Sequence, residues 1–349
     1  MKYDVAGKLH LTIPVFQAPM AGTATPALAA AVSNAGGLGG LGLGVFTVAQ
    51  AAALIEATCA MSSRPFNVNL FCHKPGVCSN DQAQDWINQT APLLHKLGAK
   101  PPEGLQEIFH SFLGDDAMLR MLIEKRPRVI SFHFGLPEPQ RLAALRETGA
   151  LLVATATSLA EAGQIAQAGL DAVIAQGWAA GGHRGIFDPD GPDDRLDTET
   201  LTRLLCHKGS LPVVAAGGIM DGADVRQALD WGAVAAQMGT AFISCPESAA
   251  DDLYRACLNA ASTTLMTRAI SGRPARFIVN EAITFAAGLP QHKVPPFPFA
   301  YDMGDALAEA ARAAQDTRFT AHLAGDGVAR SRHVSAQDLM AEIATALKA

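Results

Sequence analysis

Residues 172–185 carry side chains that could bind a cofactor and exchange a proton. They form a short apolar run followed by an amide, a glycine pair and a histidine. The apolar run has the length of a buried strand, and Gln176 places an amide at its end. Gly181 and Gly182 would let a ligand approach the backbone, and His183 can exchange a proton near neutral pH. This pattern predicts the rim of a cofactor site, although a glycine turn with an incidental surface histidine would look the same.

Two later apolar runs also end in small residues. Residues 211–219 finish near a glycine pair, and residues 233–240 finish in Gln-Met-Gly-Thr. Glycines in such places can hold a phosphate through backbone N–H groups, because no side chain obstructs the approach. The residues expected around this phosphate are Gly217, Gly218, Gly239 and Thr240.

Eight short apolar runs alternate with helical stretches along the chain. The expected strands are residues 15–20, 37–44, 66–71, 129–135, 151–157, 172–175, 211–219 and 233–240. Parallel strands need crossover connections, and eight of them close into a (β/α)8 TIM barrel. Residues 37–44 alternate glycine with leucine, so they fit either a strand packed against small side chains or a phosphate loop.

The pattern changes after the eighth run, where a single crossover would be too short to fill the remaining chain. We expect a cofactor-binding barrel over residues 1–245, an inserted, mainly helical substrate-binding lid over 246–323, and the final barrel helix within 324–349. Helices are expected near residues 248–261 and 304–315. The proline-rich residues 293–301 fit an ordered aromatic wall or a flexible linker.

Residues 72–127 are expected to form a long connection with helical patterns near 81–97 and 104–113. Cys72, His73 and Cys78 lie close together there, but the paired Cys-x-x-Cys spacing of a zinc site is missing. The acidic loop at 187–196 has the composition of a solvated surface loop. We therefore expect no metal site.

The composition narrows the class of protein. The chain has 349 residues, 49% of them hydrophobic and 17% charged, with a formal net charge of −6. It lacks a long run of Lys and Arg, so no nucleic-acid partner is expected. Neither a signal peptide nor an uninterrupted apolar span is evident, so no membrane association is expected. Six scattered cysteines are typical of reduced thiols, which favours a cytoplasmic location.

Several motifs together resemble the nitronate monooxygenases, formerly called 2-nitropropane dioxygenases. They are Gln-Ala-Pro-Met (17–20), Gly-Gly-Leu-Gly (36–39), Asn-Val-Asn (67–69), Ala-Gly-Gly-His-Arg-Gly (180–185), Ala-Ala-Gly-Gly-Ile (215–219) and Gln-Met-Gly-Thr (237–240). His133, in Ser-Phe-His-Phe-Gly (131–135), indicates the class I branch of this family.

The resemblance implies a non-covalently bound FMN and the oxidation of alkyl nitronates by O2 to a carbonyl compound and nitrite. It implies propionate 3-nitronate as the substrate and His183 as the catalytic residue. The residues implied to bind the flavin are Met20, Asn69, Gln176, Gly181, Gly217, Gly218, Gln237, Met238, Gly239 and Thr240.

The residues that would bind the substrate are less clearly marked in the sequence than those that would bind the flavin. His133 would either assist substrate binding or hold the backbone at a strand end. Family members tend to carry tyrosines and a lysine in the proline-rich stretch. Here residues 297–301 read Phe-Pro-Phe-Ala-Tyr, so Tyr301 is the expected substrate contact.

Other activities remain open at this point. One is an FMN-dependent NAD(P)H:quinone oxidoreductase, and a related one is an enoyl reductase. A phosphosugar isomerase or aldolase without flavin would also suit the glycine sites, but no lysine stands at a strand end for its chemistry. A non-catalytic binding protein is disfavoured because the polar groups converge on one barrel face. The expected partners are the small molecules alone, and a homodimer is left open.

Overall fold

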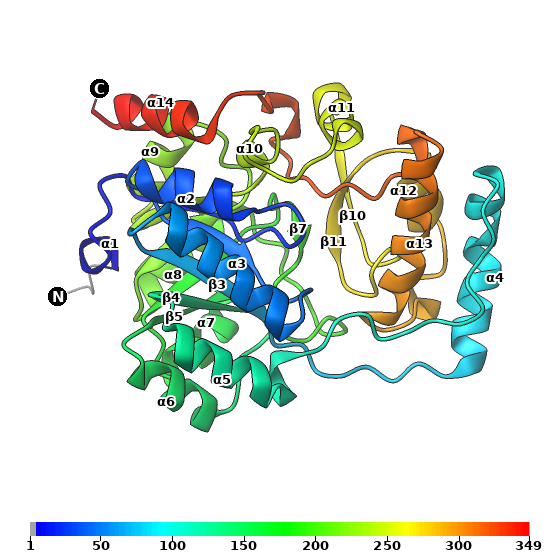
Figure 1. Cartoon of the computed structure of the whole chain (residues 1–349), viewed down its shortest axis with the longest axis horizontal. Helices are drawn as coiled ribbons and strands as arrows, with labels where there is room; N and C mark the ends of the chain where they lie inside the picture. The colour runs from blue at the N-terminus through cyan, green and yellow to red at the C-terminus, as the bar shows by residue number, and fades with distance from the viewer. Residues whose placement is uncertain (1–4, 349) are drawn as a thin grey trace.

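Eight parallel strands form the central sheet of the computed structural model, which describes residues 5–348 (Figure 1). They are β1 (Val15–Gln17), β2 (Gly39–Gly42), β3 (Phe66–Phe71), β4 (Val129–His133), β5 (Leu151–Ala156), β6 (Ala172–Gln176), β8 (Val213–Ala216) and β9 (Ala235–Met238). The sheet runs from β2 through β3, β4, β5, β6, β8 and β9 to β1. A parallel bridge between Phe16 and Leu38 then joins β1 to β2 and closes the barrel. The predicted (β/α)8 fold is confirmed.

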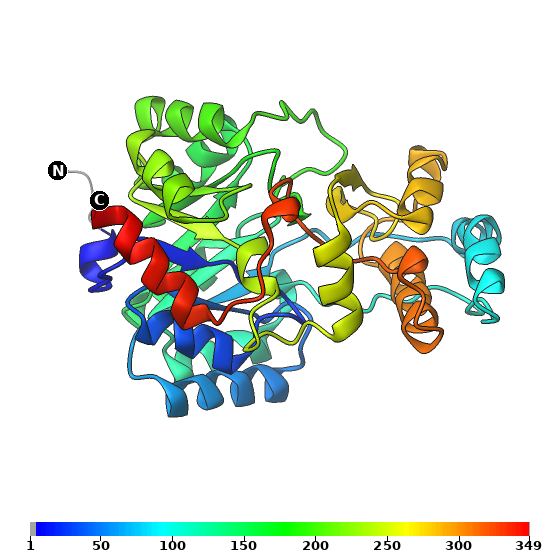
Figure 2. The same ribbon diagram turned by 90° about the horizontal axis from the view of Figure 1, so that it is seen from above.

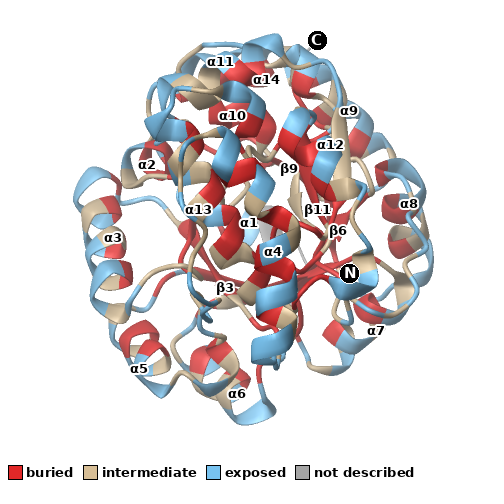
Figure 3. Cartoon of the chain, turned by 90° about the vertical axis from the view of Figure 1, so that its right-hand side faces the viewer, coloured by how far each residue is buried: buried red, intermediate tan, exposed pale blue. Residues whose placement is uncertain are grey.

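A ring of helices surrounds the barrel, as Figure 3 shows from the side of the lid. Its members are α2 (Pro26–Asn34), α3 (Val48–Met61), α5 (Asp116–Lys125), α6 (Pro139–Glu147), α7 (Leu159–Gln167), α8 (Thr198–Lys208), α9 (Gly222–Asp230) and α14 (Ala336–Lys348). Several begin at a residue whose side chain accepts an N–H from the first turn, such as Thr47 before α3 and Asp197 before α8. The last of them, α14, packs on α2 and α9, where the final barrel helix was expected.

Alternate residues of the strands fill one end of the barrel interior. Val153, Ile174 and Val214 meet there with Phe16 and Leu38, all of them almost fully buried. The short helix α1 (Val5–Lys8) lies at the same end, opposite the lid (Figure 1). Because apolar side chains occupy this end, only the carboxyl ends of the strands remain for a site.

The glycine-rich second strand packs where no side chain would fit. A Cβ built on Gly39 would lie 2.0 Å from the carbonyl oxygen of Ala29 on α2, and one on Gly42 would lie 2.7 Å from the backbone nitrogen of Ala21. This close contact supports the strand interpretation of residues 37–44 over the phosphate loop.

A second layer covers the carboxyl ends of the strands (Figures 1 and 2). It contains α11 (Asp252–Ala260), β10 (Thr264–Thr267), β11 (Ala275–Ile278), α12 (Glu281–Ala287), η2 (Gln291–Lys293), α13 (Phe299–Ala313) and η3 (Thr317–Phe319). The sequence pattern missed α12 and the antiparallel pair β10–β11. The proline-rich stretch is ordered, because Phe297 is buried and η2 and α13 flank it.

Part of the long connection belongs to this same layer. Helix α4 (Asn80–Lys96) leaves the barrel and packs on α13 (Figure 1). Trp86 and Leu94 of α4 share a buried cluster with Met303 and Leu307 of α13. The lid is therefore built from two separate stretches of chain. The boundaries expected at residues 246 and 324 stay predictions, and residues 1–4 and 349 lie outside the described residues.

One helix was predicted in the wrong place. Residues 104–111 are not helical, and only the short turn η1 (Phe112–Gly114) follows them. The helix begins later, where the Asp115 side chain accepts from the N–H of Met118 at 2.8 Å and starts α5. Gln106 instead donates its backbone N–H to Asp302 of α13, so a tertiary contact fixes this segment.

The remaining short elements are β7 (Gly182–His183), α10 (Thr240–Ile243) and η4 (Val328–Arg330). Within residues 5–348, the structure contains no helix with the length and apolar character needed to cross a membrane.

Candidate active site

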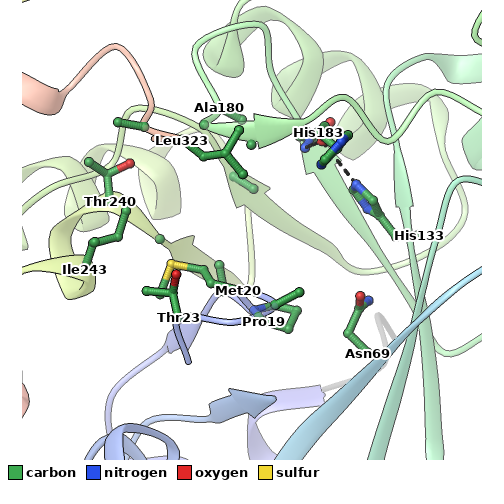
Figure 4. Close-up of a pocket in the computed structure, with 18 of the residues that line it drawn as sticks. Pro19, Met20, Thr23, Asn69, His133, Ala180, His183, Thr240, Ile243 and Leu323 are labelled. Atoms are coloured by element: carbon green, nitrogen blue, oxygen red, sulfur yellow. Dashed lines mark hydrogen bonds between the residues drawn. The ribbon is translucent and has the colours of Figure 1, made fainter. Parts of the chain in front are cut away.

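A cavity of about 470 Å³ lies between the carboxyl ends of the barrel strands and the lid (Figure 4). The structure brings nearly all predicted site residues to its walls: Met20, Asn69, His133, Gln176, Gly181, His183, Gly217, Gly218, Gln237, Gly239, Thr240 and Tyr301. Met238 is the exception. Its side chain is fully buried in the core between the barrel and its helices, and its carbonyl accepts from the N–H of Ala18 at 2.8 Å.

One side of the cavity, which we call the glycine wall, is formed by Gly217, Gly218, Gly239 and Thr240. Gly217 and Gly218 have φ angles of +128° and +72°, which side chains rarely adopt. None of the four backbone N–H groups donates to another group in the part of the chain that the structure describes. The Thr240 hydroxyl accepts from the N–H of Gly325 at 2.9 Å, so its own proton is free to donate.

The carbonyl groups of the glycine pair are held from outside the cavity. Thr198 donates its hydroxyl to the carbonyl of Gly217 at 3.0 Å, and Arg330 donates to the carbonyl of Gly218 at 2.9 Å. Neither of these two side chains lines the cavity. With both carbonyls satisfied there, the wall offers the cavity only donors, which suits an anion.

His183 lies where the barrel and the lid meet. It belongs to β7, which pairs with β11 of the lid, and the register sets His183 opposite Ala275. Its carbonyl accepts from Gln176 Nε2 at 2.9 Å, while Gln176 Oε1 accepts from the N–H of Gly185 at 2.7 Å. The Gln176 amide, expected to bond the flavin, therefore holds the histidine loop with both of its ends.

His133 also supports this loop. Its Nε2 lies 3.1 Å from the carbonyl oxygen of His183, as the dashed line in Figure 4 marks, and its Nδ1 lies 3.1 Å from Thr155 Oγ1. A carbonyl can only accept, so Nε2 carries the proton and Nδ1 accepts from the hydroxyl. Since both ring nitrogens are engaged by the protein, the contacts favour the positioning role that the sequence left open.

The imidazole of His183 sits among other rings. Ring centroids of Phe297, Tyr301 and Phe134 lie 5.5, 5.6 and 5.8 Å from its own. Burial, with smaller effects of His133 and the Arg273 guanidinium, lowers the pKa of His183 to about 3. The ring is therefore neutral at physiological pH, and it can donate or accept one proton but does not supply a cation.

Arg184, next to the histidine, has a structural role. Its side chain is buried and forms two bonds with Asp193, of 2.9 Å from Nε and 2.8 Å from Nη2. A third bond goes to the carbonyl of Gln176. Asp193 was expected to be a solvated loop residue; instead the Arg184 guanidinium holds the pKa of this carboxyl below its usual range despite partial burial.

A second part of the cavity lining, which we call the lid wall, is formed by Phe109, Tyr254, Tyr301 and Asp305. Sequence reasoning found only Tyr301 among these. Phe109 and Tyr254 lie in segments distant in the chain, where no local motif marks them. Asp305 follows Tyr301 by four residues on α13, so helical spacing alone would have placed it on the same face.

Three polar groups facing this cavity have unused bonding capacity. Nε2 of His183 and Oε1 of Gln237 are buried and have no hydrogen-bond partner among the described residues. Asn69 donates to Ser131 at 2.8 Å, while its carbonyl oxygen has no partner there and points into the cavity (Figure 4). A polar cofactor bound in the cavity would satisfy them. Within residues 5–348, no cluster of His, Cys, Asp or Glu could hold a metal ion.

The fold is a (β/α)8 barrel, and the candidate reaction centre is the cavity under the lid at the carboxyl ends of the strands. Residues 4–346 match the family model described as Nitronate monooxygenase. The chain therefore belongs to the nitronate monooxygenase family and is an oxidoreductase.

Named relatives agree with this assignment. The chain is 49% identical to a nitronate monooxygenase of Paraburkholderia phytofirmans, over 97% of this chain and 93% of the relative. It is 46% identical to a nitronate monooxygenase of Pseudomonas aeruginosa, over 97% of each chain.

Solved structures show the same fold. Nitroalkane oxidase from Streptomyces ansochromogenes superposes with a TM-score of 0.87 at 34% identity, covering 98% of this chain and 99% of that one. FabK from Thermotoga maritima gives a TM-score of 0.70 at 25% identity, covering 100% of this chain and 96% of that one.

Proposed function

We propose that this enzyme binds FMN and uses O2 to oxidise alkyl nitronates to a carbonyl compound and nitrite. The observation that carries the proposal is that His183 and the donor-lined glycine wall open into the same cavity. A phosphate held at the glycine wall would leave the rest of the cavity for the ring system and the substrate.

The residues present fit such a cofactor. The free N–H groups of Gly217, Gly218, Gly239 and Thr240 would hold the phosphate. Asn69 and Gln237 have free acceptor oxygens for the flavin, and Met20 lines the cavity nearby. Gly181 is needed for a close approach of two loops, because a Cβ there would lie 2.4 Å from the backbone nitrogen of Gly325. Met238 would support the site through its backbone alone.

Bound FMN would supply the electron acceptor for the reaction. The chain contributes orientation, exclusion of water and hydrogen bonds to the substrate. A nitronate is already an anion, so it needs donors rather than a strong base. The neutral ring of His183 can donate one hydrogen bond to a nitro oxygen, and the Tyr301 hydroxyl, which has no partner among the described residues, can donate another.

His133 and Gln176 set the position of that donor. Both donate to the carbonyl of His183, which fixes the backbone from which the imidazole projects. The pairing of β7 with β11 restrains the same residue from the lid side. The donor is thus held before substrate arrives, so little free energy is lost in ordering it.

An absorption spectrum of the purified protein, from roughly 300 to 500 nm, tests the cofactor proposal directly. We expect the two bands of an oxidised flavin and the release of FMN on boiling. Oxygen uptake with ethyl nitronate, propyl-2-nitronate and propionate 3-nitronate, the substrate that the family resemblance implies, then tests the reaction. A colourless protein without flavin would contradict the proposal.

The same preparation separates this activity from a reductase. Mixing the protein with NADH without oxygen should leave the flavin spectrum unchanged over the time of a nitronate turnover. Rapid bleaching by NADH, with slow nitronate oxidation, would instead identify an NAD(P)H:quinone oxidoreductase on the same scaffold.

A further inference from the structure

The side chains that line the cavity include a single formal charge. Asp305 is the only Asp, Glu, Lys or Arg among the described residues that line the cavity. The nearby arginines are engaged elsewhere: Arg184 pairs with Asp193, and Arg273 lies over the Phe134 ring and donates to the carbonyl of Ile186. A substrate in the cavity therefore meets no cationic side chain.

Asp305 lies along the path that a substrate tail would take. The ring of Tyr301 is 5.6 Å from that of His183, and Asp305 is one helical turn beyond Tyr301 on the same face of α13. Asp305 is exposed, lines the cavity, and has no hydrogen bond or ion pair among the described residues. A nitronate held at His183 would direct its tail past Tyr301 towards this carboxyl.

The surroundings of Asp305 do not neutralise it. Desolvation, followed by the charges of Asp302 and Glu309, raises the pKa of Asp305 to about 6, and the cation that opposes them is Arg312. Arg312 is itself paired with Asp251 at 3.2 Å. The carboxyl is therefore mostly ionised at neutral pH, at a position that lines the cavity and is also open to solvent.

We propose that Asp305 determines substrate choice by charge: it disfavours nitronates whose tail ends in a carboxylate and favours those with an uncharged or cationic tail. This inference rests on the proposed nitronate oxidation. It opposes propionate 3-nitronate as the preferred substrate, because that molecule would bring a second negative charge to the acidic end of the cavity with no cation to receive it. Asp305 is partly solvated, so we expect selectivity of about tenfold rather than exclusion.

The test compares two nitronates of nearly equal shape. Propionate 3-nitronate carries a carboxylate where the nitronate of 3-methyl-1-nitrobutane carries an isopropyl group, so that two methyl groups replace the two carboxylate oxygens. We expect the wild-type enzyme to have a kcat/KM about tenfold higher for the uncharged substrate. In the Asp305→Asn variant, this ratio should fall by about five- to tenfold. For a nitronate of the same length with an ammonium tail, Asp305→Asn should act in the opposite direction.

Glu309→Gln provides the matched control. It removes the same charge one turn further along α13, at an exposed position that does not line the cavity. The substrate ratio should then change by less than about twofold, because solvent screens a more distant charge. Equal changes in both variants would overturn a specific role for Asp305. So would a wild-type preference for propionate 3-nitronate that Asp305→Asn leaves unaltered.

A binding measurement separates this inference from the proposed reaction. Calorimetric titration of the flavin-loaded protein with 3-nitropropionate and with 3-methyl-1-nitrobutane needs no turnover. If neither nitronate is oxidised, the proposed function is wrong. The inference then stands only if the neutral ligand still binds more tightly and Asp305→Asn removes the difference, and it falls if the two ligands bind alike.

Discussion

The two walls of the cavity present different chemical groups: one presents backbone N–H groups and the other presents side chains. The glycine wall offers backbone N–H groups on short loops that follow β8 and β9, and each loop is anchored by the barrel. The lid wall offers side chains from three segments far apart in the chain, carried mainly by α11 and α13. A wall of backbone groups suits a ligand that is bound in every turnover, whereas a wall of side chains can be altered by substituting one residue at a time. This difference supports the proposals that the first wall binds the cofactor and that the second determines substrate choice.

The largest expected effect is at the junction of the walls. His183→Asn should lower kcat/KM for nitronates by about 100-fold or more, because the shorter amide cannot place a donor where the imidazole does. Flavin content should remain, since the glycine wall is untouched. Steady-state oxygen uptake and the absorption spectrum give both readouts. A variant as active as the wild type would remove His183 from the reaction.

His73, a buried histidine whose ring packs on Phe297, should make stability depend on pH. Burial, assisted by Arg273, lowers the pKa of His73 to about 4, and both of its ring nitrogens are buried without partners among the described residues. The unfolded chain binds a proton at His73 below about pH 6.5, while the folded protein does not. Stability should therefore be lost as the pH falls from about 6.5 towards 4, by roughly 2 kcal/mol at pH 5 from this residue.

Denaturant unfolding at pH 7 and pH 5 measures this loss. His73→Leu, which is similar in volume, should make the difference between the two pH values smaller by about that amount. His207→Gln changes an exposed histidine on α8 and should leave the difference as it is in the wild type. A pH dependence that His73→Leu does not alter would contradict the assignment.

A substitution in the glycine wall should lower the affinity for the cofactor. Gly218→Ala places a side chain on a residue with φ +72°, which costs about 1–2 kcal/mol, and obstructs the donor-lined surface. We expect FMN to bind about tenfold more weakly, with the order of substrate preference unchanged. Quenching of flavin fluorescence on reconstitution measures the affinity.

Gly149→Ala is the control for backbone strain. Gly149 has φ +85°, has no atom near its absent Cβ, and lies at the other end of the barrel before β5. This variant should lose similar stability and keep its flavin. If both variants lost flavin equally, strain rather than the cavity would explain the result.

The smallest effect is expected at the lid wall. Tyr301→Phe removes one hydroxyl and should raise KM about threefold with little change in kcat, as expected for the loss of one hydrogen bond to the substrate. Tyr254→Phe removes a hydroxyl that donates to the carbonyl of Leu323, so it should lower stability instead. Equal effects of the two changes on KM would show that the tyrosines do not differ in this way.

Local sequence patterns were sufficient to predict the barrel and to bring the residues of the glycine wall to one cavity. Strand β3 was predicted with the bounds that the structure shows, and the motifs at residues 215–219 and 237–240 placed the loops after β8 and β9 on one cavity. These predictions succeeded because they depend on the period of apolar residues and on glycine, both of which act over a few neighbours. The motif could not show that the Met238 side chain faces the core, because it does not reveal which face of the strand a side chain takes.

The sequence alone determined the alternation of strands and helices, the glycines that free the backbone, and the histidine beside them, because each is a property of neighbouring residues. Tertiary structure decided the rest. Pairing of β7 with β11 positions His183, burial makes its ring neutral, and α13 brings Asp305 to the cavity. Each of these depends on contacts between segments separated by many residues. The energy of such contacts comes from burial and proximity, which no local pattern records.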